Sequence, residues 1–186
     1  MSGPAQELVE DSLVLLEHLA DARRLVDVGS GGGLPGLPLK IARPSLAVTL
    51  IEADQAKAAF LVQACARLDL DAVEVLARRA EEVGQDDRYR ESFDVAVARA
   101  VAPLPVLVEL CLPLVRIGGR LLAQKTDKEP IAPAQRAIEV LGGSRARVVP
   151  ARSAVRRTGT LVIVEKVRPT PAPYPRRPGL ARRKPL

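Results

Sequence analysis

The stretch VDVGSGGGLPG, residues 26–36, places five glycines directly after an apolar run that reads as a buried strand. Glycines at such a point let a ligand approach the backbone closely, and Gly31-x-Gly33-x-x-Gly36 matches the spacing of dinucleotide-binding loops. Glu52 ends the next expected strand, where an acid can accept hydrogen bonds from ribose hydroxyls. This spacing by itself is compatible with an NAD(P)-dependent oxidoreductase.

Two further residues favour a different cofactor. Asp27 precedes the glycines and extends the pattern to Asp-x-Gly-x-Gly-x-Gly. A carboxylate there can accept hydrogen bonds from an ammonium group such as that of a methionine moiety, whereas it would repel a pyrophosphate. Pro35 fixes the chain where a helix is expected to begin. We therefore expect the loop to bind S-adenosyl-L-methionine, with contacts from Asp27, Ser30, Gly31, Gly33 and Glu52.

Apolar runs alternate with helix-like segments along most of the chain, which favours a parallel sheet with helices on both faces. The expected strands cover residues 23–29, 47–52, 73–79, 93–100 and 119–125, and the expected helices cover 35–43, 55–68, 104–115 and 130–141. Two last strands, 146–151 and 160–166, have no helix between them and should form an antiparallel hairpin. The predicted fold class is α/β: a Rossmann-like, mostly parallel seven-stranded sheet of the class I methyltransferase kind.

The composition fits one domain with an aliphatic core. Of the 186 residues only 2% are aromatic, and Phe60 and Phe93 are expected in the core. Cys65 and Cys111 lie in apolar runs and should be buried free thiols, as in a cytoplasmic protein. No apolar run approaches the roughly 20 residues of a membrane span. One His and scattered Cys give no metal-ligand spacing, so we expect neither a membrane nor a metal partner.

Positive charge is concentrated near the C-terminus. Residues 144–186 carry a net charge of +11 and residues 1–143 a net charge of −5. We expect a domain over residues 1–166 and a basic, extended Pro/Arg-rich tail without its own core over 167–186. Such a basic end suits a polyanion such as RNA, although a solubilising tail is the alternative. Further candidate RNA contacts are Arg78, Arg79, Arg152, Arg156 and Arg157.

Four stretches carry a resemblance to one known family. They are VDVGSGGGLPGLPLKIARP around the loop, RRAEE (78–82), ARAVAPLPVL (98–107) and LLAQK (121–125). These are similar to the bacterial small-subunit ribosomal RNA guanine-N7 methyltransferases, the glucose-inhibited division protein B family. The ending YPRRPGLARRKPL (174–186) also resembles tails found there, so the similarity runs from about Asp11 to the C-terminus.

The resemblance implies methylation of N7 of a guanine in 16S ribosomal RNA, with free RNA or the assembled small subunit as partner. At matching positions it implies cofactor contacts from Gly29, Leu34, Ala80, Glu81 and Arg99. Guanine N7 has a lone pair and no proton, so the reaction needs alignment rather than a general base. Arg99 and Lys125, at the ends of the fourth and fifth expected strands, are the candidate catalytic residues, because cations can fix guanine through O6 and N7. We expect a monomer.

The sequence departs from the family pattern mainly on the substrate side. Only 22 residues precede Arg23, so a shortened N-terminal helical cap is expected. Leu8 stands where the family has a histidine, and Thr126 follows Lys125 in place of a glycine. Besides a methyltransferase, two hypotheses stay open: the NAD(P)-dependent oxidoreductase, and a non-catalytic RNA- or ribosome-binding module.

Overall fold

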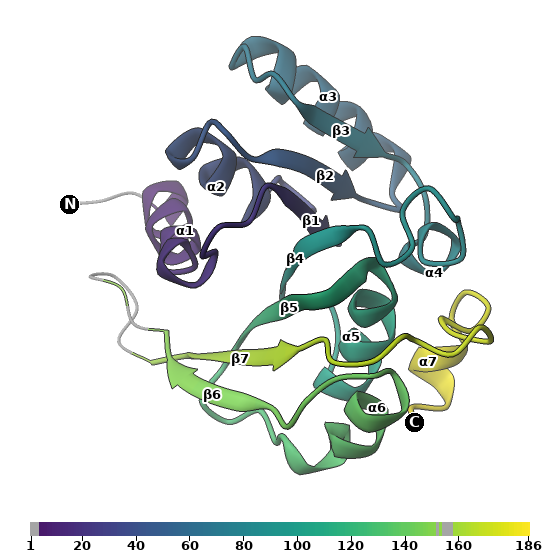
Figure 1. The fold of residues 1–186 in the computed structure, drawn as a ribbon. Coiled ribbons are helices and arrows are strands. Elements are labelled where there is room, and N and C mark those ends of the chain that lie inside the picture. The colour runs from purple at the N-terminus through teal and green to yellow at the C-terminus, as the bar shows by residue number, and fades with distance from the viewer. Residues whose placement is uncertain (1–3, 152, 154–157) are drawn as a thin grey trace.

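The chain folds into one seven-stranded sheet in the order β3-β2-β1-β4-β5-β7-β6 (Figure 1). This is a computed structural model, and it describes residues 4–151, 153 and 158–186. The strands β1 to β5 are parallel, and β7 pairs antiparallel with both β5 and β6. Their bounds are β1 (Arg24–Val28), β2 (Ala47–Ile51), β3 (Val73–Leu76), β4 (Phe93–Arg99), β5 (Val115–Lys125), β6 (Arg147–Pro150) and β7 (Thr160–Glu165). The predicted α/β class and terminal antiparallel pair are confirmed.

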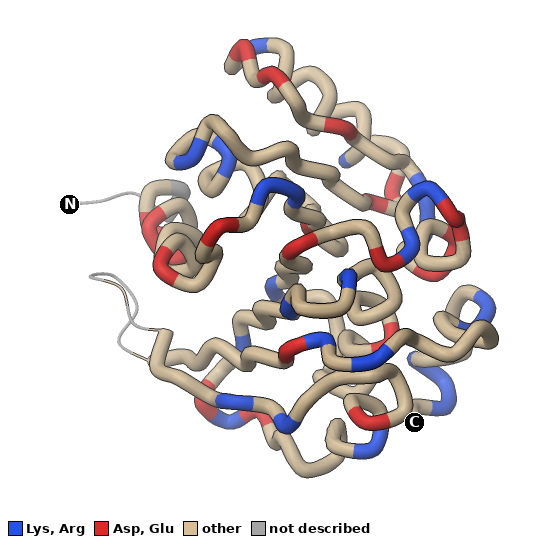
Figure 2. The backbone as a smooth tube through the Cα atoms, in the orientation of Figure 1, with Lys and Arg blue, Asp and Glu red and all other residues tan. Residues whose placement is uncertain are grey.

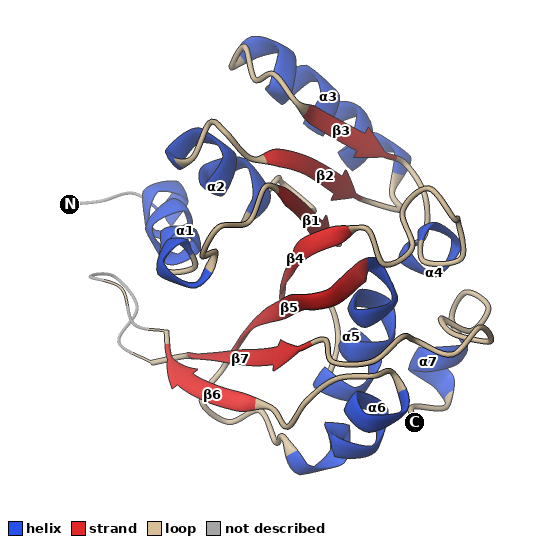
Figure 3. Ribbon diagram, in the orientation of Figure 1, coloured by secondary structure: helices blue, strands red, loops and turns tan. Residues whose placement is uncertain are grey.

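Helices cover both faces of the sheet (Figure 3). Side chains alternate between two cores along each central strand: Val95 and Val97 of β4 pack on one face, and Ala96 and Ala98 on the other. The helices are α1 (Pro4–Leu13), α2 (Gly36–Ala42), α3 (Gln55–Arg67), α4 (Ala80–Val83), α5 (Leu104–Cys111), α6 (Gln135–Val140) and α7 (Leu180–Arg183). Within the described residues, no helix has the length and apolar character to cross a membrane.

Several local expectations need correction. Strand β3 ends at Leu76 rather than at residue 79, because α4 already begins at Ala80. Phe93 is buried as expected, but Phe60 is 53% exposed because it lies on the outer side of α3. Cys65 and Cys111 are buried and free, as predicted.

The segment 167–186 lacks a core of its own, but it is not a free tail. It packs against α4 and α5 and ends in α7, where Ala181 is buried in the main core. The Arg176 guanidinium donates to both carboxylate oxygens of Glu109, at 2.8 and 2.6 Å. Glu109 on α5 is fully buried, and among the described residues its ion-pair partner is Arg176 of the C-terminal segment. The prolines and arginines thus fold onto the domain because specific partners on the domain bind them.

The glycine loop is fixed by its own strand and by the neighbouring one. The amides of Gly29 and Ser30 both donate to the carbonyl of Ile51 at the end of β2. The carboxylate of Asp27 accepts a 2.9 Å hydrogen bond from the amide of Gly36, where α2 begins. Burial raises the pKa of Asp27 to about 7, although the Gly36 hydrogen bond acts in the opposite direction. The second carboxylate oxygen of Asp27 has no hydrogen-bond partner among the described residues.

Replacing Gly36 with alanine should destabilise the fold. A Cβ at residue 36 would lie 2.6 Å from a methyl group of Leu50 and 2.7 Å from the bonded Asp27 oxygen. Such overpacking costs about 1–3 kcal/mol of unfolding free energy, measurable by urea denaturation. Gly32→Ala is the matched control, since nothing lies within 4 Å of its Cβ position. Equal stability of the two variants would contradict the packing described for Gly36.

The raised pKa of Asp27 predicts a pH-dependent stability. Because the folded state holds the Asp27 proton more tightly than the unfolded state, the stability it contributes is complete below the ordinary aspartate pKa of 3.8 and is lost as the pH rises to about 7. Relative to Asp27→Asn, the wild type should therefore lose up to about 4 kcal/mol of unfolding free energy across this range. Denaturation curves at pH 4 to 8 measure the difference.

Asp94 offers the opposite case as a control. Partial burial raises its pKa, but hydrogen bonds from the amides of Arg24 and Arg23 and from the Arg116 side chain outweigh burial, and the pKa is lowered overall. Asp94→Asn should therefore cost stability at pH 7 and lose its effect as the medium becomes acidic. Parallel pH profiles for wild type and Asp27→Asn would show that Asp27 does not titrate as described.

Candidate functional site

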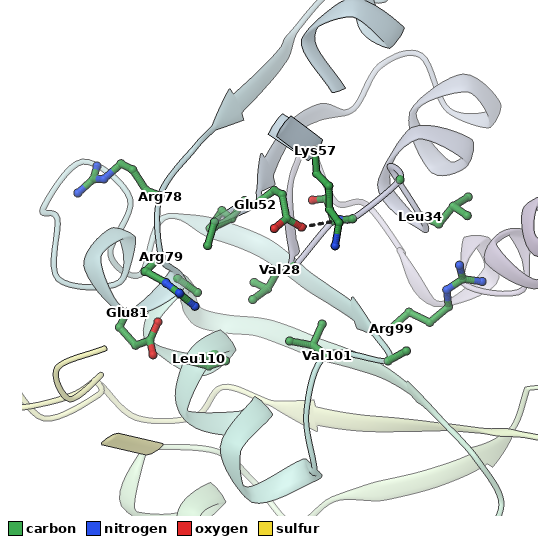
Figure 4. A pocket seen from close by; sticks show the side chains of 18 of the residues that line it. Val28, Leu34, Glu52, Lys57, Arg78, Arg79, Glu81, Arg99, Val101 and Leu110 are labelled. Atoms are coloured by element: carbon green, nitrogen blue, oxygen red, sulfur yellow. Dashed lines mark hydrogen bonds between the residues drawn. The ribbon is translucent and has the colours of Figure 1, made fainter. Parts of the chain in front are cut away.

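A pocket of about 410 Å³ opens at the carboxyl ends of strands β1 to β4 (Figure 4). This edge of an open α/β sheet is where ligands bind, because the loops that follow the strands diverge there. The glycine loop forms one wall, and the turns after β2, β3 and β4 form the others. The lining residues are Val28, Gly29, Ser30, Gly31, Gly32, Leu34, Ile51, Glu52, Ala53, Lys57, Arg78, Arg79, Ala80, Glu81, Arg99, Ala100, Val101, Leu110 and Arg182.

Most of the residues that the sequence analysis expected to bind the cofactor line this pocket. Eight of them come together from four separate turns: Gly29, Ser30, Gly31, Leu34, Glu52, Ala80, Glu81 and Arg99. Glu52 lies at the centre of the group, with one oxygen accepting from the amide of Gly31 and the other from the amide of Asp54, both at 2.9 Å. Figure 4 shows its carboxylate beside the glycine loop, with Lys57 reaching toward the same space. The carboxylate thus joins the end of β2 to the loop after β1.

Asp27 and Gly33 do not line the pocket, although direct cofactor contacts were expected from both. Asp27 is fully buried beneath the loop, and its carboxylate points to the start of α2 rather than to the open space. Gly33 is buried, and any Cβ there would collide with the side chain of Leu37. Both residues lie on the buried side of the loop, where they fix its shape without reaching the pocket.

A second hollow of about 670 Å³ adjoins the first. The two share Arg99, Ala100 and Val101 in the turn after β4. Both candidate catalytic residues, Arg99 and Lys125, line the second hollow. Of these two, Arg99 also lines the first hollow. The remaining lining residues are Leu8, Asp11, Ala102, Pro103, Gln124, Thr126 and Glu129.

The two cations of the second hollow are held by neighbouring acids. The ammonium of Lys125 donates to the carbonyl of Ala102 and lies 3.2 Å from the Glu129 carboxylate. The guanidinium of Arg99 lies 3.5 Å from the carboxylate of Asp11 on α1. Both side chains are mostly buried, at 7% and 17% exposure, so they are oriented before any ligand arrives. The short N-terminal helix α1 thereby closes one side of this hollow.

Sequence reasoning gave no role to several residues that line the first hollow, including Lys57, Val101 and Arg182. Lys57 lies in the first turn of α3, after the capping Asp54. Val101 is the second residue after β4, at the edge of the sheet where ligands are expected. Arg182 comes from the far end of the chain, and no local pattern indicates it. Arg152, Arg156 and Arg157, expected as RNA contacts, lie outside the described residues.

The first hollow combines apolar walls with a carboxylate. Ile51, Ala53, Val101 and Leu110 supply the apolar walls, and Glu52 supplies hydrogen-bond acceptors beside them. The second hollow offers donors from fixed cations next to that site. In the part of the chain that the structure describes, His, Cys, Asp and Glu form no group that could hold a metal ion.

Comparison with known proteins identifies close relatives. The family model described as rRNA small subunit methyltransferase G matches residues 5–158. The Ribosomal RNA small subunit methyltransferase G of Moorella thermoacetica is 45% identical over 186 residues, covering 96% of this chain and 76% of that protein. The protein of the same name from Roseiflexus castenholzii is 50% identical over 165 residues, covering 88% and 70%.

Solved structures show the same fold at low sequence identity. A SAM-dependent O-methyltransferase from Thermotoga maritima aligns with a TM-score of 0.64 and 17% identity, covering 92% of this chain and 68% of that one. An rRNA methylase from Streptococcus thermophilus aligns with a TM-score of 0.59 and 21% identity, covering 90% and 99%. The nicotinamide-dependent alternative is not favoured by any of these matches. The chain belongs to the rRNA small subunit methyltransferase G family.

Proposed function

We propose that the protein transfers the methyl group of S-adenosyl-L-methionine to N7 of a guanine in small-subunit ribosomal RNA. The observation that carries the proposal is the pair of adjoining hollows that share the turn after β4. One hollow has the walls of a nucleoside site and the other has fixed cations, so cofactor and base would meet at Arg99, Ala100 and Val101. Such a substrate implies a cytoplasmic protein, with the RNA or the assembling subunit as partner.

In the first hollow the residues of this chain fit the parts of the cofactor. Glu52 would accept hydrogen bonds from the ribose hydroxyls, at the cost of rearranging its bonds to the loop amides. Gly29, Ser30, Gly31 and Leu34 would take the methionine part along the glycine loop, where a Cβ at Gly29 would meet Val101 at 2.8 Å. Ala80 and Glu81 would border the adenine ring. When bound, the cofactor supplies the electrophilic methyl group.

In the second hollow the residues of this chain would orient the guanine ring. N7 of guanine carries a free lone pair, so the chain need not remove a proton before the methyl group is transferred. Arg99 and Lys125 can donate to guanine O6 and hold the ring so that the N7 lone pair stays free and in line with the methyl group. Their carboxylate partners, Asp11 and Glu129, fix the direction of those donors.

Radiolabelled methyl from S-adenosylmethionine should appear as 7-methylguanine in unmethylated small subunits or in their naked RNA. Lys125→Met should lower kcat/KM for the RNA by roughly tenfold to a hundredfold, the discrimination that one good contact to a base supplies. The binding of S-adenosylhomocysteine should change less than twofold, because Lys125 does not line the first hollow. Digestion of the RNA and chromatography of the labelled base provide the measurement.

Two results would count against this proposal. Wild-type protein that binds RNA but transfers no methyl group would support the non-catalytic RNA-binding module. Label in another atom of the RNA would keep the methyltransferase and reject guanine N7. Loss of S-adenosylhomocysteine binding in Lys125→Met would instead place Lys125 at the cofactor.

RNA binding should depend on exposed cations near the pocket edge. Arg79 is exposed and lines the pocket, and Arg177 is exposed on the C-terminal segment, whereas Arg78 is engaged with Asp86 at 2.8 Å. Figure 2 shows Lys and Arg positions along this segment and on β6. The double variant Arg79→Gln/Arg177→Gln should flatten the slope of log affinity against log salt by about 1.4, near 0.7 per single-strand phosphate contact. Fluorescence anisotropy at several salt concentrations measures the slope, and an unchanged slope would exclude both arginines from the RNA contact.

A further inference from the structure

The C-terminal segment reaches the cofactor pocket at two of its walls. The amide of Gly179 donates a 2.9 Å hydrogen bond to the Glu81 carboxylate, at the turn after β3. The guanidinium of Arg182 donates to the carbonyl of Val101 at 3.1 Å, in the turn after β4, and the side chain itself lines the pocket. One short segment therefore contacts two turns that come from different strands and that both border the pocket.

The segment is anchored firmly enough to hold those turns. Arg176 makes a two-pronged ion pair with the buried Glu109 of α5. Arg90 donates to the carbonyls of Thr170 and Tyr174 at 2.8 and 2.6 Å. Two anchored points thus precede Gly179, and the buried Ala181 follows it. Because the segment is fixed before Gly179 and after it, its contacts with the pocket turns are held in a defined position.

The Val101 contact continues into the glycine loop. A Cβ added at Gly29 would meet the Val101 side chain at 2.8 Å, so the two residues already pack without spare room. Arg182 holds the backbone of Val101 and thereby limits how far that turn can move away from the loop. Glu81, 9% exposed, is held on the other side by Gly179.

We propose that residues 174–186 form a clasp that shapes the adenosine end of the cofactor pocket, with Arg182 as its positioning residue. The proposal rests on the proposed function, since it takes S-adenosylmethionine as the ligand. It assigns the basic C-terminal segment to the cofactor and not to RNA alone. Without the clasp, the turns after β3 and β4 lose the contact that joins them, and the ligand must order them on binding.

Isothermal titration with S-adenosylhomocysteine tests the clasp in the full chain. Arg182→Ala should bind about fivefold to tenfold more weakly, the loss expected when one ordinary intramolecular hydrogen bond no longer holds the turn. Arg183→Ala is the matched control, because Arg183 is the next residue on α7, is exposed and lines neither hollow, and it should bind within twofold of wild type. Arg182→Lys, which retains a cationic donor, should lie between the two.

Three readouts separate positioning from a general loss of structure. Titration with adenosine alone should show the same fold-change as S-adenosylhomocysteine, since the clasp acts at the adenosine end. In methyl transfer, the KM for S-adenosylmethionine should rise while kcat at saturating cofactor stays near the wild-type value. The melting temperature without ligand should differ little between Arg182→Ala and Arg183→Ala.

A chain that ends at Pro178 removes the whole pocket contact and should lose still more cofactor affinity. If Arg182→Ala and this shortened chain both bind S-adenosylhomocysteine within twofold of wild type, the clasp is refuted. If the shortened chain does not fold, Arg182→Ala alone decides. Unchanged cofactor binding with weakened RNA binding would assign the segment to RNA. Failure of the wild type to bind S-adenosylhomocysteine would instead contradict the proposed function.

Discussion

The buried Asp27 carboxylate and the amide of Gly36 make the contact on which the site depends. This 2.9 Å hydrogen bond fixes the start of α2 against the end of β1, and the glycine loop must cross between them. The loop can stay open to a ligand because its shape is set from beneath. The arrangement is costly, since burial of the carboxylate raises its pKa to about 7.

The strand order of the sheet places two adjoining hollows beside the glycine loop. Parallel strands bring the turns after β1, β2, β3 and β4 to one edge, and the turn after β4 serves both hollows. The antiparallel β7 extends the sheet beyond β5, whose last residue, Lys125, lies in the second hollow. For the proposed reaction, alignment of cofactor and base would follow from strand order rather than from any single catalytic group. For a nucleophile that needs no deprotonation, alignment is the main demand on the protein.

Several basic side chains of this protein pair with acidic residues inside the fold instead of facing solvent. Arg99 and Lys125 face acids within the second hollow, and Arg176 neutralises a glutamate in the core. Buried ion pairs of this kind fix geometry more than they add stability. A count of basic residues at the C-terminus suggests an RNA-binding tail, but at least one of those residues anchors the segment to the domain.

The sequence alone determined the class of fold, the order of its elements and eight of the residues that line the first hollow, because apolar runs and a glycine loop are local signals. It also indicated Glu52, since the end of β2 lies beside the loop in any such sheet. Tertiary structure alone decided that Asp27 points away from the pocket, that Lys125 lies in the second hollow and that Arg182 reaches the first. These depend on side-chain direction and on contacts between residues far apart in the chain, which no local pattern encodes.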